Sequence, residues 1–577
     1  MLTPWGEALD KNAVLQEYPR PQLRRESFYN LNGVWDYAVT PSGEEPEVWD
    51  GEIVVPFSPE APLSGAARGP AKDEYLHYRR GFTLPEGFQK SRVLLHFGAV
   101  DQIAEVFVNG VSAAKHSGGY WPFSADITSL LREGENILRV TVRDNADDPT
   151  FAYGKQRYKR GGMWYTAQSG IWQTVWLESV PEVYVKSLHI TPEFDEARVR
   201  IELETALESS TAITCDVRAA DGSFVAGSWA KGGVCIVPLP GFRAWTPDDT
   251  YLYTLDITCG EDRVESYFAM RKFSYVELGG HKVFGLNNAP LFHNGLLDQG
   301  YYPDGLLTPP SDEAMVNDIE TMKRCGFNML RKHIKIEPLR WYYHCDRLGM
   351  IVWQDMVSGG QPYSFLHVSA LPTLGKVDLP DQDAKPYGRS GVLSRARFRR
   401  EMADTVRLLY NCPCIALWTV FNEGWGQFDA LDMANELKKL DPTRFIDHAS
   451  GWQDQGYEEM KSRHIYFRPV KLKNDGRALA LTEYGGYILA VDGHRWTDKV
   501  FGYRICRNSA ALAHDYEKLM LGQILPHIRK EGLTAAVYTQ ITDVEEELNG
   551  LMTYDREVLK IPEETLREIN AALRFDA

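Results

Sequence analysis

The sequence lacks the features that mark several large classes of protein. It holds 63 Lys and Arg against 79 Asp and Glu, a formal net charge of −16, and so lacks the basic excess with which proteins neutralise nucleic-acid phosphates. No run approaches the roughly 18 apolar residues of a membrane-spanning helix. Residues 1–10 show no basic segment followed by an apolar run, the pattern of a secretory signal. We therefore expect no nucleic-acid partner, no membrane contact and a cytoplasmic location.

Cysteines are few and scattered. None of the 8 forms a C-x-x-C pair, the spacing found in zinc sites and redox motifs. We therefore expect buried free thiols, as in reducing compartments, and no metal site. Aromatic residues, in contrast, make up 12% of the chain. Most belong in the core, but such rings also suit stacking against the C–H faces of sugars.

The first half of the chain has the pattern of β-sheet domains. A length of 577 residues predicts three or four domains, at roughly 150 residues each. Within residues 1–183, alternating Leu138, Val140 and Val142 and the turn Asn109-Gly110 predict a β-sandwich, which the family resemblance described below implies is jelly-roll-type and sugar-binding-like. Residues 184–277 show the same alternation and suit one immunoglobulin-like β-sandwich acting as a spacer.

The chain from residue 278 to 577 changes to short apolar runs separated by helices. One helix is expected to start at Ser311, after Pro309-Pro310, and to end at Gly326. The runs are Leu291–Asn294, Met329–His333, Ile351–Asp355, Ile415–Glu423, Phe445–Ser450, His464–Phe467, Leu479–Tyr484 and Ala535–Thr542. Eight such runs predict a (β/α)₈ TIM barrel, whose chemistry lies at the C-terminal ends of its strands.

Two of these runs end in a glutamate. Glu423 closes the fourth run, and Glu483 closes the seventh. A strand-terminal Glu taken alone is more often solvated or ion-paired. Two of them across one barrel mouth suit a retaining glycosidase, whose carboxyl groups lie about 5–5.5 Å apart.

The order of the domains and five motifs together resemble glycoside hydrolase family 2, the family of β-galactosidases, β-glucuronidases and β-mannosidases. The motifs are F-N-E-G-W-G, L-T-E-Y-G-G, F-N-M-L-R-K-H, H-I-Y-F and V-W-Q-D. The resemblance implies that Glu423 is the general acid/base and Glu483 the nucleophile, with no organic cofactor. It also implies roles around the sugar for six more residues: Asn422, Arg331, His333, Asp355, His464 and Tyr466.

Each of these assignments has a structural alternative that the sequence leaves open. Arg331 suits a structural ion pair, the two histidines suit the core, and Asp355 suits a loop cap. Three further candidates come from the residues themselves. Asp298 is a sugar contact or a turn former, and Trp425 and Trp452 are sugar platforms or packing at the barrel rim. The acidic segment 543–547 is expected to be a solvated loop.

The identity of the sugar is less well defined. Family β-glucuronidases carry an Asn-x-Lys element after the eighth strand, whereas here Asn549 is followed by Gly and Leu. An exo-acting retaining β-galactosidase is therefore the first expectation, ahead of a β-glucuronidase or galacturonidase, a β-mannosidase or a β-pentosidase. The rival class is a non-catalytic carbohydrate-binding protein on the same scaffold. A homo-oligomer is compatible with the sequence.

Overall fold

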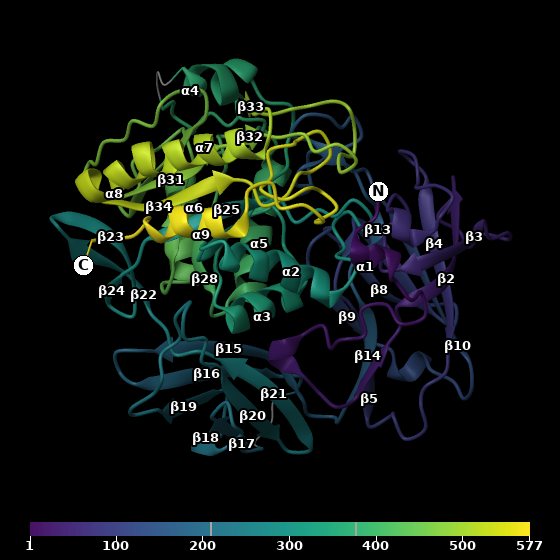
Figure 1. Ribbon diagram of the computed structural model, residues 1–577. Coiled ribbons are helices and arrows are strands. Elements are labelled where there is room, and N and C mark those ends of the chain that lie inside the picture. Colours follow the sequence, from purple (N-terminus) through teal and green to yellow (C-terminus); the bar gives the residue numbers. More distant parts are fainter. Residues whose placement is uncertain (208–210, 375–377, 577) are drawn as a thin grey trace.

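The computed structural model describes residues 1–207, 211–374 and 378–576 (Figure 1). It confirms a multidomain chain with N-terminal β-sandwich sheets, further β-sheets and a C-terminal eight-stranded parallel barrel. In Figure 1 the purple and blue N-terminal sheets lie beside the green and yellow barrel, and the teal sheets lie below both. The division into residues 1–183, 184–277 and 278–577 stays a prediction.

Two antiparallel sheets form the N-terminal sandwich. The four-stranded sheet runs β1 (Phe28–Asn30), β14 (Val175–Val180), β5 (Arg92–Phe97) and β9 (Phe123–Asp126). The six-stranded sheet runs β3 (Gly51–Val55), β2 (Gly33–Thr40), β4 (Tyr75–Phe82), β10 (Asn136–Arg143), β7 (Ile103–Val108) and β8 (Val111–Ser117). The predicted turn is confirmed, because Asn109 and Gly110 join β7 to β8 with φ of 52° and 82°, as a type I′ turn requires.

The next sheets contain a second apolar core. One sheet consists of β15 (Val185–Glu193), β16 (Arg198–Thr205) and β19 (Val234–Pro238). The other consists of β18 (Phe224–Ala230), β17 (Ile213–Arg218), β20 (Tyr253–Cys259) and β21 (Asp262–Phe268). Val199, Ile201 and Leu203 of β16 are buried between these sheets, as their alternation predicts.

A small sheet covers the N-terminal end of the barrel. It comprises β22 (Phe273–Leu278), β23 (His281–Leu286) and β24 (Ala289–Pro290). Phe284 of β23 packs on Phe445 and Trp353 inside the barrel, with ring centroids 4.3 and 5.9 Å away. This end of the barrel is therefore filled with aromatic side chains.

The barrel strands are parallel and follow the expected order. Around the sheet they are β29 (Phe445–Asp447), β28 (Ile415–Thr419), β27 (Ile351–Asp355), β26 (Met329–Lys332), β25 (His293–Asp298), β34 (Leu533–Thr539), β31 (Ala478–Gly485) and β30 (Met460–Ile465). Several expected runs differ from the strands in their bounds; β34, for example, begins two and ends three residues before the run 535–542. β25 begins two residues later and ends four residues later than Leu291–Asn294, and β30 begins four residues before His464. Both strands contain polar residues, which an apolar run does not reveal.

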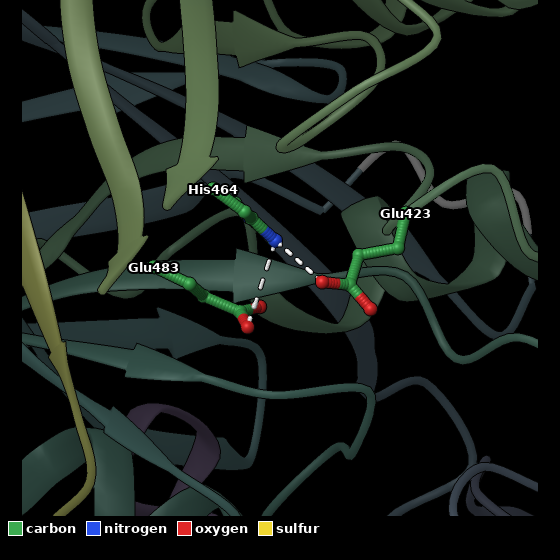
Figure 2. A group of neighbouring side chains, drawn as sticks. All are labelled: Glu423, His464 and Glu483. Atoms are coloured by element: carbon green, nitrogen blue, oxygen red, sulfur yellow. Dashed lines mark hydrogen bonds and ion pairs between the residues drawn. The ribbon is translucent and has the colours of Figure 1, made fainter. Parts of the chain in front are cut away.

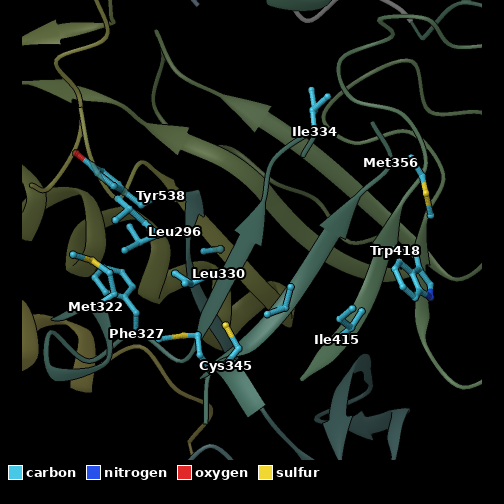
Figure 3. Packing of buried hydrophobic residues seen from close by; sticks show 14 of the residues in the cluster. Leu296, Met322, Phe327, Leu330, Ile334, Cys345, Met356, Ile415, Trp418 and Tyr538 are labelled. Carbon is cyan, nitrogen blue, oxygen red and sulfur yellow. The ribbon is translucent and has the colours of Figure 1, made fainter. Parts of the chain in front are cut away.

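Side chains of the barrel strands alternate between its interior and its helices. Leu296, Leu330 and Trp418 belong to the cluster that packs under the helices (Figure 3), whereas Leu297 and Met329 belong to the interior cluster. The helices are α2 (Asp312–Arg324), α3 (Leu339–Leu348), α5 (Val392–Leu409), α6 (Ala430–Leu440), α7 (Ser509–Leu519), α8 (Leu525–Glu531) and α9 (Glu563–Ala571).

The expected helix and the expected thiols are both found. α2 is capped by Ser311, whose hydroxyl accepts a hydrogen bond from the Ala314 N–H at 3.2 Å, and Gly326 follows its end with φ of 88°. All eight cysteines are buried and free. Within the described ranges, no helix combines the length and apolarity needed to span a bilayer.

Candidate active site

Strand alternation places a set of polar side chains inside the barrel at its C-terminal end. Met329 and Trp353 face the interior, so Arg331 and Asp355, two residues further along the same strands, face it too. His464, near the end of β30, faces the same region because side chains alternate along that strand too. The covered N-terminal end leaves this opposite end as the place for chemistry.

Glu423 and Glu483 approach each other closely across the barrel mouth (Figure 2). The His464 Nδ1 atom lies 2.8 Å from an oxygen of Glu423 and 3.6 Å from an oxygen of Glu483. The three ligating atoms lie within 4.8 Å of one another. That spacing fits the short carboxyl separation of retaining glycosidases and is too small for the about 6.5–9.5 Å of inverting ones.

The backbone after β28 directs Glu423 into this position. Glu423 has a φ of 53°, and Gly424 and Gly426 follow with 73° and 69°. A left-handed conformation is costly for a residue with a Cβ atom, and an added Cβ on Gly426 would lie 2.6 Å from the Arg389 guanidinium. The glycines of N-E-G-W-G thus form the turn that presents Glu423.

The Glu483 carboxylate is held by donors on both oxygens. Arg331 Nη1 donates to Oε1 at 3.1 Å, and the Tyr466 hydroxyl donates to Oε2 at 2.5 Å. The side chain is nearly fully buried, with an exposed fraction of 4%.

Arg331 is the centre of a larger buried network. Its Nε and Nη2 atoms donate to the two oxygens of Asp355 at 2.9 and 3.0 Å. Nη2 also donates to the side-chain amide oxygen of Asn422 at 2.9 Å. His333 Nδ1 lies 2.7 Å from Asp355. Although burial alone would raise the pKa of Asp355, Arg331 and His333 lower it to about 2.

The surroundings of Glu423 have the opposite effect on its acidity. Burial raises the pKa of Glu423, and the cations Lys155, His333 and Arg331 offset this rise only in part. Burial also lowers the pKa of His464 to about 3, so the imidazole between the two glutamates is neutral. A carboxyl group whose pKa is raised by burial therefore lies beside one that accepts hydrogen bonds from Arg331 and Tyr466.

Three of the remaining candidates have structural partners. Asp298 points away from the other candidates, because its neighbour Leu297 occupies the barrel interior; its carboxylate accepts from Lys332 at 2.6 Å and from the Gly300 N–H at 2.8 Å. Trp425 packs edge-on against Trp164 at 5.0 Å. Trp452 donates from its indole N–H to the Glu423 carbonyl oxygen at 2.8 Å.

The segment after the eighth strand is not the solvated acidic loop that the sequence predicted. Asp543, Glu545 and Glu547 are buried, with exposed fractions of 2%, 2% and 4%. Lys560 pairs with Asp543 at 2.6 Å, and the Tyr165 hydroxyl donates to Glu547. Burial raises the pKa of Glu547, and the charge of Glu483 contributes to that rise, which places Glu547 near the candidate pair.

Two groups among the described residues have spacing that suits a metal ion. One is Glu423, His464 and Glu483, and the other is His494, Asp555 and Glu557. In the first group the Glu483 oxygens already accept hydrogen bonds from Arg331 and Tyr466. The same spacing of Glu423 and Glu483 also suits the two carboxyl groups of a retaining glycosidase.

Fold and site together define a class: a (β/α)₈-barrel hydrolase with a closely spaced pair of glutamates. Two family models match the chain. Residues 62–181 match the sugar binding domain of glycosyl hydrolases family 2, and residues 309–472 match its TIM barrel domain. Both models describe domains of one family, and the chain belongs to glycoside hydrolase family 2.

Known relatives of the chain are distant. A β-galactosidase of Halalkalibacterium halodurans is 23% identical over 502 residues, which are 79% of this chain and 45% of that protein. Human β-glucuronidase is 23% identical over 510 residues, 78% of this chain and 73% of the relative. The chain thus spans about half the length of the β-galactosidases that it matches first.

Solved structures share the fold over almost the whole chain. A β-glucuronidase from an uncultured Clostridium species superposes with a TM-score of 0.74 at 18% identity, covering 96% of this chain and 99% of that one. Several other structures with the same fold are also β-glucuronidases. At this identity the likeness concerns the fold.

Proposed function

We propose that the chain is an exo-acting retaining β-glycosidase in which Glu483 is the nucleophile and Glu423 the general acid/base. One observation carries the proposal: the carboxyl groups of half-buried Glu423 and buried Glu483 have oxygens within 4.8 Å of one another, and their surroundings differ. Glu483 accepts from Arg331 and Tyr466, whereas burial raises the pKa of Glu423.

The reaction takes place in two displacements. Glu483 attacks the anomeric carbon, and a covalent bond forms as the bond to the leaving oxygen breaks. Glu423 gives its proton to that oxygen. In the second step Glu423 takes a proton from water, whose oxygen attacks the anomeric carbon and releases Glu483.

The residues around the pair orient it and bind the sugar. Asn422 accepts from Arg331 through its carbonyl oxygen, which leaves its amide N–H₂ to donate to the sugar 2-hydroxyl, a contact that strengthens as charge develops on the ring. His464, neutral and 2.8 Å from Glu423, holds the acid/base side chain in place. Asp355 and His333 fix the orientation of the Arg331 guanidinium.

A terminal β-linked uronic acid is the sugar that we propose first. The structural relatives are mainly β-glucuronidases, and a buried lysine, described below, lies beside the carboxylate pair. A β-galactoside is the second candidate. It is favoured by the β-galactosidases among the relatives and by Glu547, which lies in the segment where family β-glucuronidases carry Asn-x-Lys.

Azide rescue of two variants tests the assignment of roles. With Glu423→Ala, an aryl β-glycoside with a good leaving group should still form the glycosyl-enzyme, and azide should release a β-glycosyl azide. With Glu483→Gly, azide should take the place of the nucleophile and give the α-glycosyl azide. NMR of the products distinguishes the two anomers. The reverse pattern would exchange the roles, and wild-type turnover in Glu483→Gln would refute the proposal.

A further inference from the structure

A segment of the N-terminal sandwich forms one wall of the barrel mouth. We call residues 153–166 the sandwich strap. Its N-terminal part is fixed to the barrel by Gly154, whose N–H donates to the Ser358 carbonyl oxygen at 2.9 Å. Its C-terminal part is fixed by Gly162 and Thr166, whose N–H groups donate to Glu546 at 2.9 Å and Glu545 at 2.8 Å. Side chains of the strap are therefore held against the active site.

Lys155 lies between these two attachments. Its carbonyl oxygen accepts from the Tyr165 N–H at 2.9 Å, and the Tyr165 hydroxyl contacts Glu547. Its ammonium nitrogen lies 5.6 Å from the centre of the Trp164 ring, which packs on Trp425, two residues after Glu423. Among the neighbouring charges, that of Lys155 lowers the pKa of Glu423 and of Glu547 the most. The ammonium group thus lies near enough to both carboxyl groups for its charge to act on them.

Lys155 differs from the other buried lysines in having no anionic partner. Lys332 pairs with Asp298 at 2.6 Å, Lys335 with Glu337 at 2.8 Å and Lys560 with Asp543 at 2.6 Å. Lys155 has an exposed fraction of 8%, yet within the described ranges its ammonium group forms no hydrogen bond or ion pair. Burying a cation without a partner is costly. A ligand that brings a negative charge would remove this cost.

The other cation at the site has no donors to spare for a ligand. Arg331 is occupied by Asp355, Glu483, the Thr482 carbonyl oxygen and Asn422. Arg157 of the strap stacks on Trp164 at 4.4 Å and lies 3.9 Å from Asp147, so it has an acidic neighbour. Lys155 is therefore the cation in this part of the described chain that is available to bind an anion inside the site.

We propose that Lys155 binds the carboxylate of the terminal β-linked uronic acid and determines the preference for that substrate. The assignment rests on the proposed function, because it requires the sugar to sit between Glu423 and Glu483. The Lys155 ammonium replaces, from another domain, the cation that is missing after the eighth strand. Glu547 opposes a bound carboxylate less than a free acidic group would, because the Tyr165 hydroxyl contacts its carboxyl group and burial raises the pKa of Glu547.

The test compares wild type, Lys155→Met and Lys155→Arg on 4-nitrophenyl β-glucuronide, β-galacturonide, β-galactoside and β-glucoside. Lys155→Met should lose about 10- to 150-fold in kcat/KM on the preferred uronide, the usual loss for a hydrogen bond to a charged group, with little change on the neutral glycosides. Lys155→Arg should keep part of the uronide activity. Lys159→Met is the matched control, since Lys159 belongs to the same strap and is exposed.

A binding measurement separates recognition from folding. Free glucuronate or galacturonate should raise the Tm of the wild type and not that of Lys155→Met, while removal of an unpaired buried charge leaves the unliganded Tm equal or higher. Equal losses on uronides and neutral glycosides, or a wild type that hydrolyses neutral glycosides alone, would overturn the role of Lys155 and leave the glycosidase mechanism standing. Unchanged turnover in Glu483→Gln would overturn the mechanism itself.

Discussion

Replacing Arg331 by methionine should damage both the stability of the barrel and its catalysis. Arg331 is fully buried and donates to Asp355, Glu483 and Asn422. Removing one partner from a buried ion pair costs about 3–5 kcal/mol, because it leaves a charge without compensation. For a barrel of this size, we expect a decrease in Tm of roughly 6–15 °C.

The pH dependence of stability gives this prediction a specific sign. In the wild type Arg331 and His333 lower the pKa of Asp355 from 3.8 to about 2, which is worth about 2 kcal/mol. That stability is complete above about pH 4 and is lost as the pH falls towards 2. In Arg331→Met, burial without the guanidinium raises the pKa of Asp355, so the variant should instead gain stability as the pH falls from 7 to 4.

Arg444→Met supplies a matched control. Arg444 is equally buried and pairs with Asp441 at 2.6 Å. Although burial alone would raise the pKa of Asp441, Arg444 lowers it to about 2. It contacts the Ile415 carbonyl oxygen at the start of β28, at the end of the barrel opposite the active site. Both variants should therefore lose stability with the same dependence on pH.

Kinetics distinguish the two arginine variants. Arg331→Met should lower kcat by about 10²- to 10³-fold at a temperature where it is folded, as the loss of a preorganised charge does in other enzymes. Arg444→Met should keep the wild-type kcat. Urea unfolding from pH 3 to 8 and steady-state assays on one aryl glycoside measure both effects. Equal losses of kcat in the two variants would refute the reasoning, as would an Arg331→Met protein of wild-type activity.

Two further predictions concern acidity and the position of Asp298. Glu423 is the proposed acid, and burial raises its pKa, so kcat/KM should fall as the pH rises through the pKa of Glu423. Glu423→Gln should abolish this alkaline limb with an activated aryl substrate. An unchanged limb would point to another acid. Asp298→Asn should lower the Tm, because Lys332 loses one of its two carboxylate partners, and should leave KM unchanged; a raised KM at unchanged Tm would instead make Asp298 a sugar contact.

The proximity of Glu423 and Glu483 could be predicted from the sequence because its signal is local. An apolar run followed by a carboxylate marks the end of a buried parallel strand, and Glu423 and Glu483 both follow such runs. The position of Asp298 could not be predicted in the same way. A side chain on a strand changes face with a shift of one residue, and the expected run 291–294 gave no register for β25, which extends to residue 298.

The contributions of the sandwich strap had no such local signal. Lys155 and Glu547 meet at one site although almost four hundred residues separate them in the chain, and nothing near either residue indicates the other. Glu547 belongs to an acidic segment that looks solvated in the sequence. It is buried because the Tyr165 hydroxyl donates to its carboxyl group. Strap N–H groups donate in the same way to Glu546 and Glu545. Composition shows charge, whereas burial depends on packing between domains.

The two buried cations at the barrel mouth, Arg331 and Lys155, have different roles in the proposed site. Arg331 is saturated by protein acceptors, so its charge fixes the nucleophile and has little left for a ligand. Lys155 has an aromatic neighbour and, among the residues that the structure describes, no ion-pair partner, so its charge is available to the substrate. Substitution at Arg331 should therefore affect every glycoside alike, whereas substitution at Lys155 should change the ranking among glycosides. We therefore expect catalysis and selection of the sugar to be separable by mutation. Catalysis depends on Arg331 in the barrel, and selection of the sugar depends on Lys155 in the sandwich strap.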